Sequence, residues 1–324
     1  MSRSTQLSPP ETNGDTDDEP TAAPTHARPP SGPLAFWKAH DLPILFILPT
    51  VLLIGGFMIF PLGYSIVMSF FDWNGLTEAT FTGLDNYARL IADSGFWGAV
   101  QNNGLFLLLF TFFTVSLGFI FAVAISRRMK GWRIYRFTFF IPFILVTAVI
   151  AVLWAQIYEP THGILNSALG AIGLESWQQL WLGNPTLTMY SISVIAIWQL
   201  SGWTMLLYLG AMEAIDEEIH DAATIDGVSS WQRCWYIIAP LVRRMTIVLV
   251  MLQIIAAIKT FDLIWVLTKG GPFYASEVMG TLLYRTAFEQ QDFGYASTVA
   301  VAMTVIVMVS TLIYLKFTKL TDQE

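Results

Sequence analysis

Six apolar runs divide this 324-residue chain, and each is long enough to cross a lipid bilayer as a helix. A helix needs roughly 20 predominantly apolar residues to span the hydrocarbon core. The chain is 54% hydrophobic and only 13% charged, which excludes an ordinary soluble enzyme and a disordered protein. We therefore predict an all-α, multi-pass membrane protein with six transmembrane helices, over residues 42–71, 99–125, 137–158, 187–212, 245–267 and 296–315.

The remaining composition limits the chemistry that the chain can perform. A net charge of −7 argues against a nucleic-acid partner, which would require a basic surface. A single cysteine, Cys234, excludes a disulfide framework and a cysteine-based metal site. The four histidines are isolated, and the sequence has no G-x-x-x-x-G-K-[ST] phosphate loop. We expect no catalytic residue, no metal and no cofactor in this chain, which is therefore not an enzyme by itself.

Polar residues outside the apolar runs define the expected domains. Residues 1–33 contain seven of the fifteen prolines, five acids and almost no large apolar side chain, which predicts a disordered cytoplasmic tail. Residues 34–318 form the expected transmembrane domain, and residues 319–324 form a short cytoplasmic C-terminus. The loop at 126–136 carries five basic residues and no acid, so it is expected on the cytoplasmic side. With six spans, both termini are then cytoplasmic and the chain lies in the plasma or inner membrane.

One cytoplasmic connection, over residues 213–244, has an unusual pattern. Six acids lie in its first half, Ala222 and Ala223 follow the fifth of them, and Gly227 allows a sharp turn. After the turn, apolar and aromatic residues recur at helical intervals as far as Pro240. This pattern predicts a helix, a glycine turn and an amphipathic helix under the membrane, in which the small residues can fit a partner's cleft. The alternative is a solvated acidic loop that only joins two spans.

The same residues resemble the Glu-Ala-Ala signature of ABC importer permeases. Asp221, Ala222, Ala223, Gly227 and Pro240 occupy matching spacings, with Asp221 where the family has Glu. The stretches FTGLDNYARLIAD (81–93), FDLIWVLTKGGP (261–272) and DFGYAS (292–297) are similar to the larger, maltose- and glycerol-phosphate-type permeases of the carbohydrate branch.

This resemblance implies a type I importer permease that forms half of a translocation path for a sugar or sugar derivative. It implies three partners: a second permease subunit, an ATPase dimer that docks on residues 213–242 and carries ATP and Mg, and an extracytoplasmic solute-binding protein. The five signature residues would make the ATPase-coupling contact.

Polar and aromatic residues within the spans suggest where a sugar could bind. Gln253, Ala257 and Thr260 lie on one helical stripe, and Gln199 and Trp203 share a face of another helix. Amides and an aromatic plane suit the hydroxyl groups and the C–H face of a sugar. The resemblance places the substrate path on Gln199, Leu200, Trp203, Gln253, Ala256, Ala257 and Thr260. The alternative is that these side chains only join helices through hydrogen bonds.

Two further alternatives concern charge and function class. Lys259 and Asp262 are expected on neighbouring positions of one helix, where they favour a structural pair over a functional one. An ABC permease for an amino acid or a polyamine would predict more acids inside the spans. A secondary transporter would require ion-binding acids and inverted repeats, and a membrane enzyme would require a nucleophile or metal set. The sequence does not identify the sugar.

Overall fold

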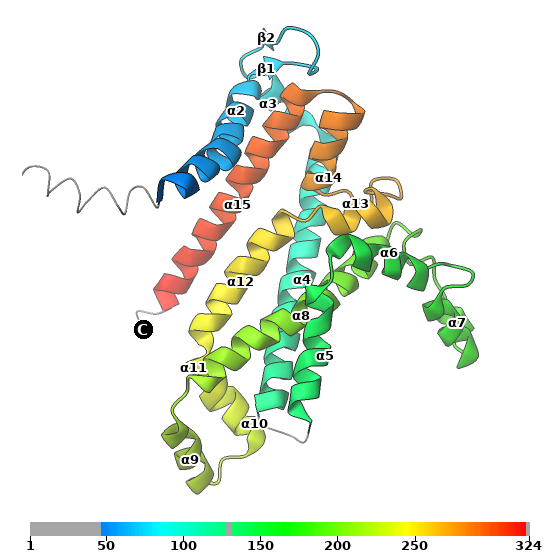
Figure 1. Ribbon diagram of the computed structural model, residues 1–324. Coiled ribbons are helices and arrows are strands. Elements are labelled where there is room, and N and C mark those ends of the chain that lie inside the picture. Colours follow the sequence, from blue (N-terminus) through cyan, green and yellow to red (C-terminus); the bar gives the residue numbers. More distant parts are fainter. Residues whose placement is uncertain (1–46, 127–130, 322–324) are drawn as a thin grey trace, which may run out of the picture. The chain divides into compact units, whose positions relative to one another are not determined.

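The computed structural model describes residues 47–126 and 131–321, and it is mainly helical (Figure 1). It divides into two units, Met1–Ile59 and Phe60–Glu324. The described part of the first unit, residues 47–59, is helical and ends in the π-helical turn Gly55–Ile59 (η1). The tail predicted at 1–33 lies outside the described residues.

The second unit contains the long helices, several short ones and one two-stranded sheet. In chain order the elements are α2 (Phe60–Met68), β1 (Phe71–Asp72), β2 (Thr80–Phe81), α3 (Asp85–Ala92), α4 (Ser94–Ser126), α5 (Trp132–Ile144), α6 (Thr147–Ile157), α7 (Ile164–Ala171), η2 (Glu175–Trp177), α8 (Thr188–Glu213), α9 (Glu217–Ile225), α10 (Ser230–Gln232), η3 (Arg233–Ile238), α11 (Ala239–Leu241), α12 (Arg243–Ile258), α13 (Asp262–Thr268), α14 (Met279–Tyr284), η4 (Arg285–Glu289) and α15 (Phe293–Thr321).

Four helices in the described chain are long and apolar enough to cross a membrane, namely Ile47–Met68, Ser94–Ser126, Thr188–Glu213 and Phe293–Lys316. The number rises to six if each of two bent helix pairs counts as one span. The structure therefore supports a helical protein with four to six spans, and the six that the apolar runs predict is the upper value of this range.

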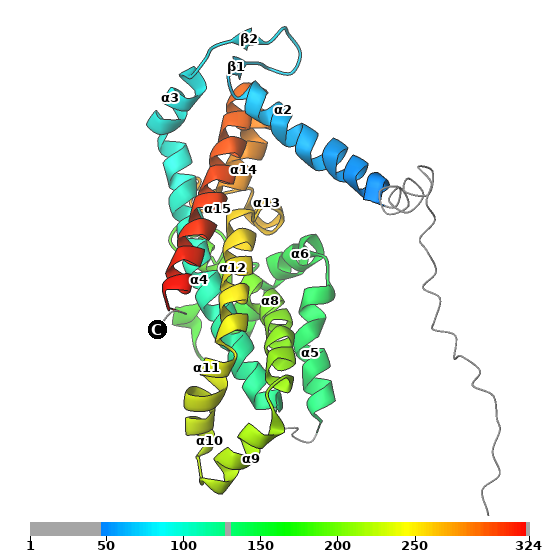
Figure 2. The same cartoon turned by 90° about the vertical axis from the view of Figure 1, so that its left-hand side faces the viewer.

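The elements of the second unit are arranged between two ends. Figures 1 and 2 show β1 and β2 at one end, here called the hairpin end, and α9 and α10 at the other, here called the α9 end. Helix α4 runs from near α3 toward the α9 end, α8 and α12 pack on it and on each other, and α15 packs on α12, α14 and α2. At the hairpin end, β1 pairs antiparallel with β2 in the register Phe71↔Phe81.

Small residues bring three of these helices close together. A Cβ atom on Gly118 of α4 would lie 2.5 Å from the Cγ2 of Thr204 in α8. A Cβ atom on Gly202 of α8 would lie 1.8 Å from the carbonyl oxygen of Phe139 in α5. Small residues at helix interfaces are typical of membrane proteins, where packing rather than the hydrophobic effect drives helix association. Helix α8 is thereby held between α4 and α5.

Two of the expected spans are interrupted. The run at 137–158 forms α5 and α6, which meet at Leu145 and Val146 with a bend of 99°. The run at 245–267 forms α12 and α13, separated by residues 259–261. All residues at the first break are apolar, so hydropathy gives no sign of it. The ends of these four helices leave backbone N–H and C=O groups without partners in the same helix, and other groups have to form hydrogen bonds with them.

The segment between α13 and α15, which connects two of the expected spans, contains the helices α14 and η4. Helix α14 begins beside the break at residues 259–261. A Cβ atom on Gly280 of α14 would lie 2.9 Å from the carbonyl oxygen of Thr260. From there α14 and η4 lead to the hairpin end (Figure 1). At that end the carbonyl oxygen of Trp73 accepts hydrogen bonds from the backbone N–H groups of Phe293 (2.9 Å) and Gly294 (3.2 Å).

Candidate functional site

Helix α9 contains the predicted coupling residues, and its C-terminus explains the glycine. The N–H of Val228 donates to the carbonyl of Ala223 (3.0 Å) and that of Gly227 to the carbonyl of Thr224 (3.2 Å), which together form a Schellman motif. Gly227 adopts φ +67°, a left-handed conformation that side chains with a Cβ atom adopt at a cost. The helix, glycine turn and second helix predicted from the sequence are confirmed.

The segment after the turn is also fixed to α9. Ser229 and Gln232 form a reciprocal capping box at the start of α10, with hydrogen bonds of 3.3 and 3.0 Å. The guanidinium of Arg233 donates to the hydroxyl of Thr224 in α9 over 2.7 Å. These bonds join both sides of the turn, so that α9 and the following helical segment form one stiff unit.

The surface of this unit is accessible where a partner would bind. Asp221, Ala222, Gly227 and Pro240 are exposed, whereas Ala223 is buried against the rest of the chain. Of the small residues, Ala222 and Gly227 thus lie on the outer face, and Ala223 packs inward. The ATPase-coupling role of these five residues stays a prediction.

A cavity of about 820 Å³ separates α9 from the ends of α4, α5 and α8. Its polar lining includes Arg136, Glu213, Glu217, His220 and Arg233, and Arg136 and Glu213 form a long ion pair of 3.9 Å. Glu213, one of the six acids of the segment, therefore pairs with a basic residue of the chain itself, and Glu217 lines the same cavity. At least one acid of this segment therefore contacts the chain itself and not only a partner.

Gln199, a predicted substrate-path residue, lies at the break between α5 and α6. Its side chain is 5% exposed, and its amide donates to the hydroxyl of Thr147 (3.2 Å) and to the carbonyl of Leu145 (3.4 Å). Gln199 therefore satisfies an acceptor on each side of the break. This geometry agrees with a role in joining helices.

Gln253 lies in the interior between α8 and α12. It is 1% exposed, and its amide donates to the hydroxyl of Thr204 over 3.3 Å. Its Oε1 atom is buried and accepts no hydrogen bond from any described residue. Gln253 therefore keeps one unused acceptor near the centre of the unit.

The other predicted path residues have mixed environments. Trp203 is partly exposed and stacks on Phe143 of α5, with ring centroids 5.8 Å apart. Ala257 is buried and accepts a hydrogen bond from Asn103, whereas Ala256 is exposed and Leu200 and Thr260 are partly exposed. The seven residues lie on α8, on α12 and in the break after α12, where the Thr260 N–H donates to the Ala257 carbonyl over 3.3 Å. Their contact with a substrate stays a prediction.

The expectation that Lys259 and Asp262 share a helix is wrong. Helix α12 ends at Ile258, and α13 begins at Asp262, so that the break separates the two residues. Both side chains are exposed, and they form no ion pair within the described chain. Asp262 instead lies in the first turn of α13, where a carboxylate interacts favourably with the helix dipole.

Sequence reasoning missed two polar contacts near this break. Asn103 of α4 is buried; its amide donates to the carbonyl of Ala257 (3.1 Å), and its oxygen accepts from the N–H of Met279 (2.8 Å). The neighbouring Asn102 donates to the carbonyl of Glu277 over 2.8 Å. Two adjacent amides inside an apolar run are a signal that could have identified this junction, because such groups are costly when unpaired in a membrane.

An ion pair supports the loop that precedes α14. The Nη1 of Arg285 lies 2.7 Å from the Oε1 of Glu277, and its Nη2 donates to the carbonyl of Lys269 over 2.6 Å. Burial raises the pKa of Glu277 above its ordinary value, and the guanidinium of Arg285 opposes that shift. Among the described residues, no group of three or more His, Cys, Asp or Glu side chains could hold a metal ion.

Comparison with known proteins identifies the class of this fold. Residues 114–324 match the family model described as the inner membrane component of binding-protein-dependent transport systems. A probable ABC transporter permease protein of Pyrococcus horikoshii is 36% identical over 86% of this chain and 96% of its own length. The trehalose/maltose transport system permease protein MalF of Thermococcus litoralis is 31% identical over 86% of this chain and 94% of its own.

A solved structure has the same fold. A chain of a bacterial ABC transporter involved in the import of the acidic polysaccharide alginate superposes with a TM-score of 0.78, at 20% identity, over 88% of this chain and 98% of that one. A second structure of the bacterial alginate transporter, in complex with an alginate pentasaccharide-bound periplasmic protein, gives a TM-score of 0.77 at 21% identity.

Proposed function

The chain belongs to the family of inner membrane components of binding-protein-dependent transport systems, and we propose that it is the permease subunit of an ATP-driven sugar importer. It is a membrane transport component and not an enzyme. The relatives support a carbohydrate cargo, because they include permeases named for trehalose/maltose, for diacetylchitobiose and for lactose. The polar side chains near the helix breaks can offer amide and hydroxyl groups to a neutral solute of this kind.

In this proposal six spans cross the membrane, with both termini and the α9 end in the cytoplasm. The five basic residues of the 126–136 loop support that orientation. The two bent pairs, Trp132–Ile144 with Thr147–Ile157 and Ser230–Leu241 with Arg243–Ile258, would each count as one span. Broken helices near mid-membrane are a recurrent feature of transporters, where they provide polar backbone groups beside the substrate.

The ATPase would act on the stiff unit formed by α9 and the segment after Gly227. The observation that carries this assignment is the Schellman motif together with the Arg233–Thr224 bond, which leaves Asp221 and Ala222 exposed on a helix that cannot bend freely at its end. Movement of a docked ATPase would then displace the whole unit. ATP and Mg would be bound by that separate ATPase dimer and not by this chain.

Three kinds of partner complete the importer: a second permease, the ATPase dimer and an extracytoplasmic solute-binding protein. The alginate transporter, solved together with a sugar-loaded periplasmic protein, supports the last of these by its similar fold. The partial exposure of Leu200, Trp203 and Thr260 in the isolated chain supports a path completed by a second permease.

Co-purification and transport assays test this function. The tagged chain, expressed with its chromosomal neighbours, is expected to carry down a second permease and an ATPase. Proteoliposomes of that complex, supplied with the binding protein and a panel of maltose, trehalose, lactose and maltotriose, are expected to take up at least one sugar only when ATP is enclosed. Purification of the chain alone, or uptake driven by an ion gradient without ATP, would overturn the proposal.

A further inference from the structure

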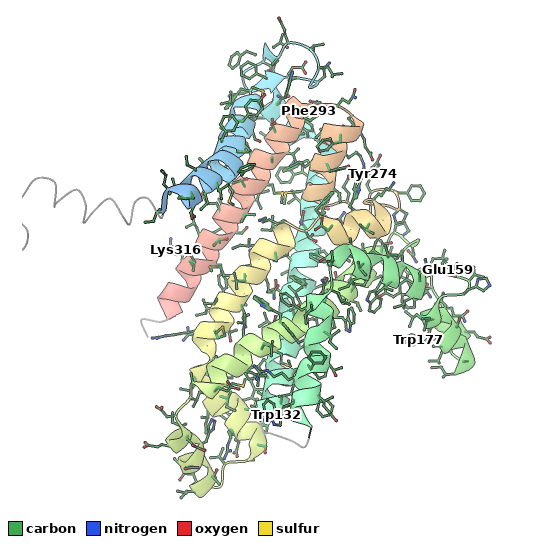
Figure 3. The ribbon with its side chains drawn as sticks, viewed as in Figure 1. Trp132, Glu159, Trp177, Tyr274, Phe293 and Lys316 are labelled. Atoms are coloured by element: carbon green, nitrogen blue, oxygen red, sulfur yellow. The ribbon has the colours of Figure 1, made fainter. Side chains whose placement is uncertain are left out.

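Six aromatic rings form a continuous series from the hairpin end to the break between α12 and α13. We call this series the aromatic track; its members are Trp73, Phe293, Phe288, Tyr284, Trp265 and Phe261. Figure 3 labels Phe293 near the hairpin end, and Thr260, a predicted path residue, directly precedes Phe261 at the other end of the track. The track thus links one end of the unit to the proposed substrate path.

Consecutive rings of the track are in contact throughout. From the hairpin end, the centroid distances are 5.6 Å for Trp73–Phe293, 5.9 Å for Phe293–Phe288, and 4.9 Å for Phe288–Tyr284. Tyr284 then contacts both rings at the break, over 4.5 Å to Trp265 and 5.3 Å to Phe261. Each distance lies in the range of paired aromatic rings.

The fold brings these rings together from separate elements. Tyr284 reaches the break because Gly280, one turn earlier in α14, lies against Thr260 and Phe261. Phe293 reaches Trp73 because its backbone N–H donates to the Trp73 carbonyl over 2.9 Å. Phe288 lies in η4 between them, one turn after Tyr284.

The track rings differ from the aromatic residues of the interior. Tyr158 and Tyr208 are buried, and their hydroxyls bond to the Ser191 carbonyl and to Thr246. Phe288 is 61% exposed, and the other five rings of the track are partly exposed. Within the described chain, neither the Tyr284 hydroxyl nor the Trp265 indole N–H has a hydrogen-bond partner. The track therefore has open ring faces and free donors.

The residues that follow Phe288 of the track are too polar to face lipid tails. Glu289, Gln290 and Gln291 follow Phe288 directly and are exposed. Exposing a carboxylate and amides to hydrocarbon is costly, so this part faces water or a polar solute. Open aromatic faces beside free donors and polar groups match a carbohydrate ring, which has an apolar C–H face and a rim of hydroxyls.

We propose that the aromatic track is a carbohydrate-binding surface that guides pyranose rings from the hairpin end to the break at residues 259–261. This proposal rests on the proposed function, and it adds the element by which the sugar would reach the path. Several similar and individually weak contacts suit conduction, because a solute must bind well enough to enter and weakly enough to leave.

The test uses proteoliposomes of the assembled importer with its binding protein and the panel sugar that the wild type takes up fastest. The variants are Phe288→Leu, which removes an exposed ring, and Tyr284→Phe, which removes only the hydroxyl. Phe112→Leu is the matched control, since Phe112 is 65% exposed on α4 and outside the track.

The maximal uptake rate of Phe288→Leu should fall roughly three- to tenfold, which corresponds to the loss of one aromatic stacking contact. The maximal uptake rate of Tyr284→Phe should fall less, and that of Phe112→Leu should equal the rate of the wild type. The KM for the loaded binding protein should stay unchanged in all three variants, since the track acts after docking.

Three results would overturn the proposal. Both track variants could have the same maximal uptake rate as Phe112→Leu, which would show that the rings have only a structural role. Phe288→Leu could raise the KM alone, which would make the surface a docking site for the binding protein, or it could lose the second permease on purification, which would make it a subunit interface. Absence of sugar uptake by the wild type would instead reject the proposed function itself.

Discussion

Gly202 of α8 packs against the backbone of Phe139 in α5, so closely that a Cβ atom would lie 1.8 Å from the Phe139 carbonyl oxygen. A backbone carbonyl within a helix cannot move aside as a flexible side chain could. The spacing of α5 and α8 therefore depends on this one missing methyl group. Trp203, the next residue, stacks on Phe143 of the same helix, so the contact also fixes the surroundings of a predicted path residue.

The substitution Gly202→Ala is expected to destabilise the folded chain by roughly 1–3 kcal/mol, since it overpacks a close helix contact. Thermal unfolding of the detergent-purified complex measures this effect. Gly210→Ala is the matched control, because Gly210 lies in the same helix with nothing within 4 Å of its Cβ position. Equal unfolding temperatures for the two variants would contradict the packing argument.

Replacement of Gly227 by valine should uncouple transport while leaving insertion and assembly intact. The left-handed φ of +67° costs an L-residue about 1–2 kcal/mol, so the Schellman turn that ends α9 should be lost or distorted. ATP-dependent uptake should then fall at least tenfold in proteoliposomes.

Gly173→Val controls for strain alone, because Gly173 also has a positive φ (+78°) and nothing within 4 Å of its Cβ position, but it lies far from α9 in sequence. It should keep wild-type uptake. Normal uptake by Gly227→Val would show that the geometry of this turn is not needed for coupling.

Removal of the Asn103 amide should have a large effect on stability. In Asn103→Leu the carbonyl of Ala257 and the N–H of Met279 lose their shared partner in a buried site. The Ala257 carbonyl keeps the Thr260 N–H (3.3 Å), so the one buried group left without a partner, the Met279 N–H, should cost roughly 1–3 kcal/mol. Gln101→Leu, an exposed amide two residues earlier in α4, should unfold within a degree or two of the wild type. A similar shift in both variants would indicate a general effect of added apolar surface instead.

The carboxyl of Glu277 gives the loop before α14 a predictable pH dependence. Its pKa is raised mainly by burial, with Arg285 acting in the opposite direction, so the folded state binds its proton more tightly than the unfolded state. Its contribution to stability is therefore greatest below the ordinary pKa of 4.5 and decreases as pH rises through the raised pKa.

Unfolding temperatures of the wild type and of Glu277→Gln, measured from pH 4.5 to pH 7.5, test this sign. The stability of the wild type relative to the variant should decline across that range, because glutamine does not titrate. A relative stability that rises with pH would mean that the Arg285 charge outweighs burial.

The sequence was sufficient to predict the long uninterrupted helices and the coupling segment. Apolar length located α4, α8 and α15, and the glycine after two alanines located the turn that ends α9. These features are local: one depends on hydropathy over about 20 residues, and the other on the backbone freedom of a single residue.

The breaks could not be predicted from the same signals. Leu145 and Val146 are as apolar as their neighbours, and the acceptors at that break are satisfied by Gln199, over 50 residues away in α8. The interruption after Ile258 likewise depends on Asn103 and on the close approach of Gly280, both remote in sequence. Hydropathy reports how readily a segment enters a bilayer, and it carries no information on such tertiary contacts.

Asn103 also constrains the order of events during synthesis. The two backbone groups that it bonds lie 154 and 176 residues further along the chain. When α4 leaves the ribosome, neither partner has been made, and the amide has to remain hydrated or bind elsewhere until residue 279 has been added. Final docking of α4 within this chain is therefore a late step of biogenesis, and a nascent chain truncated before α14 should hold that helix in a different setting from the finished protein.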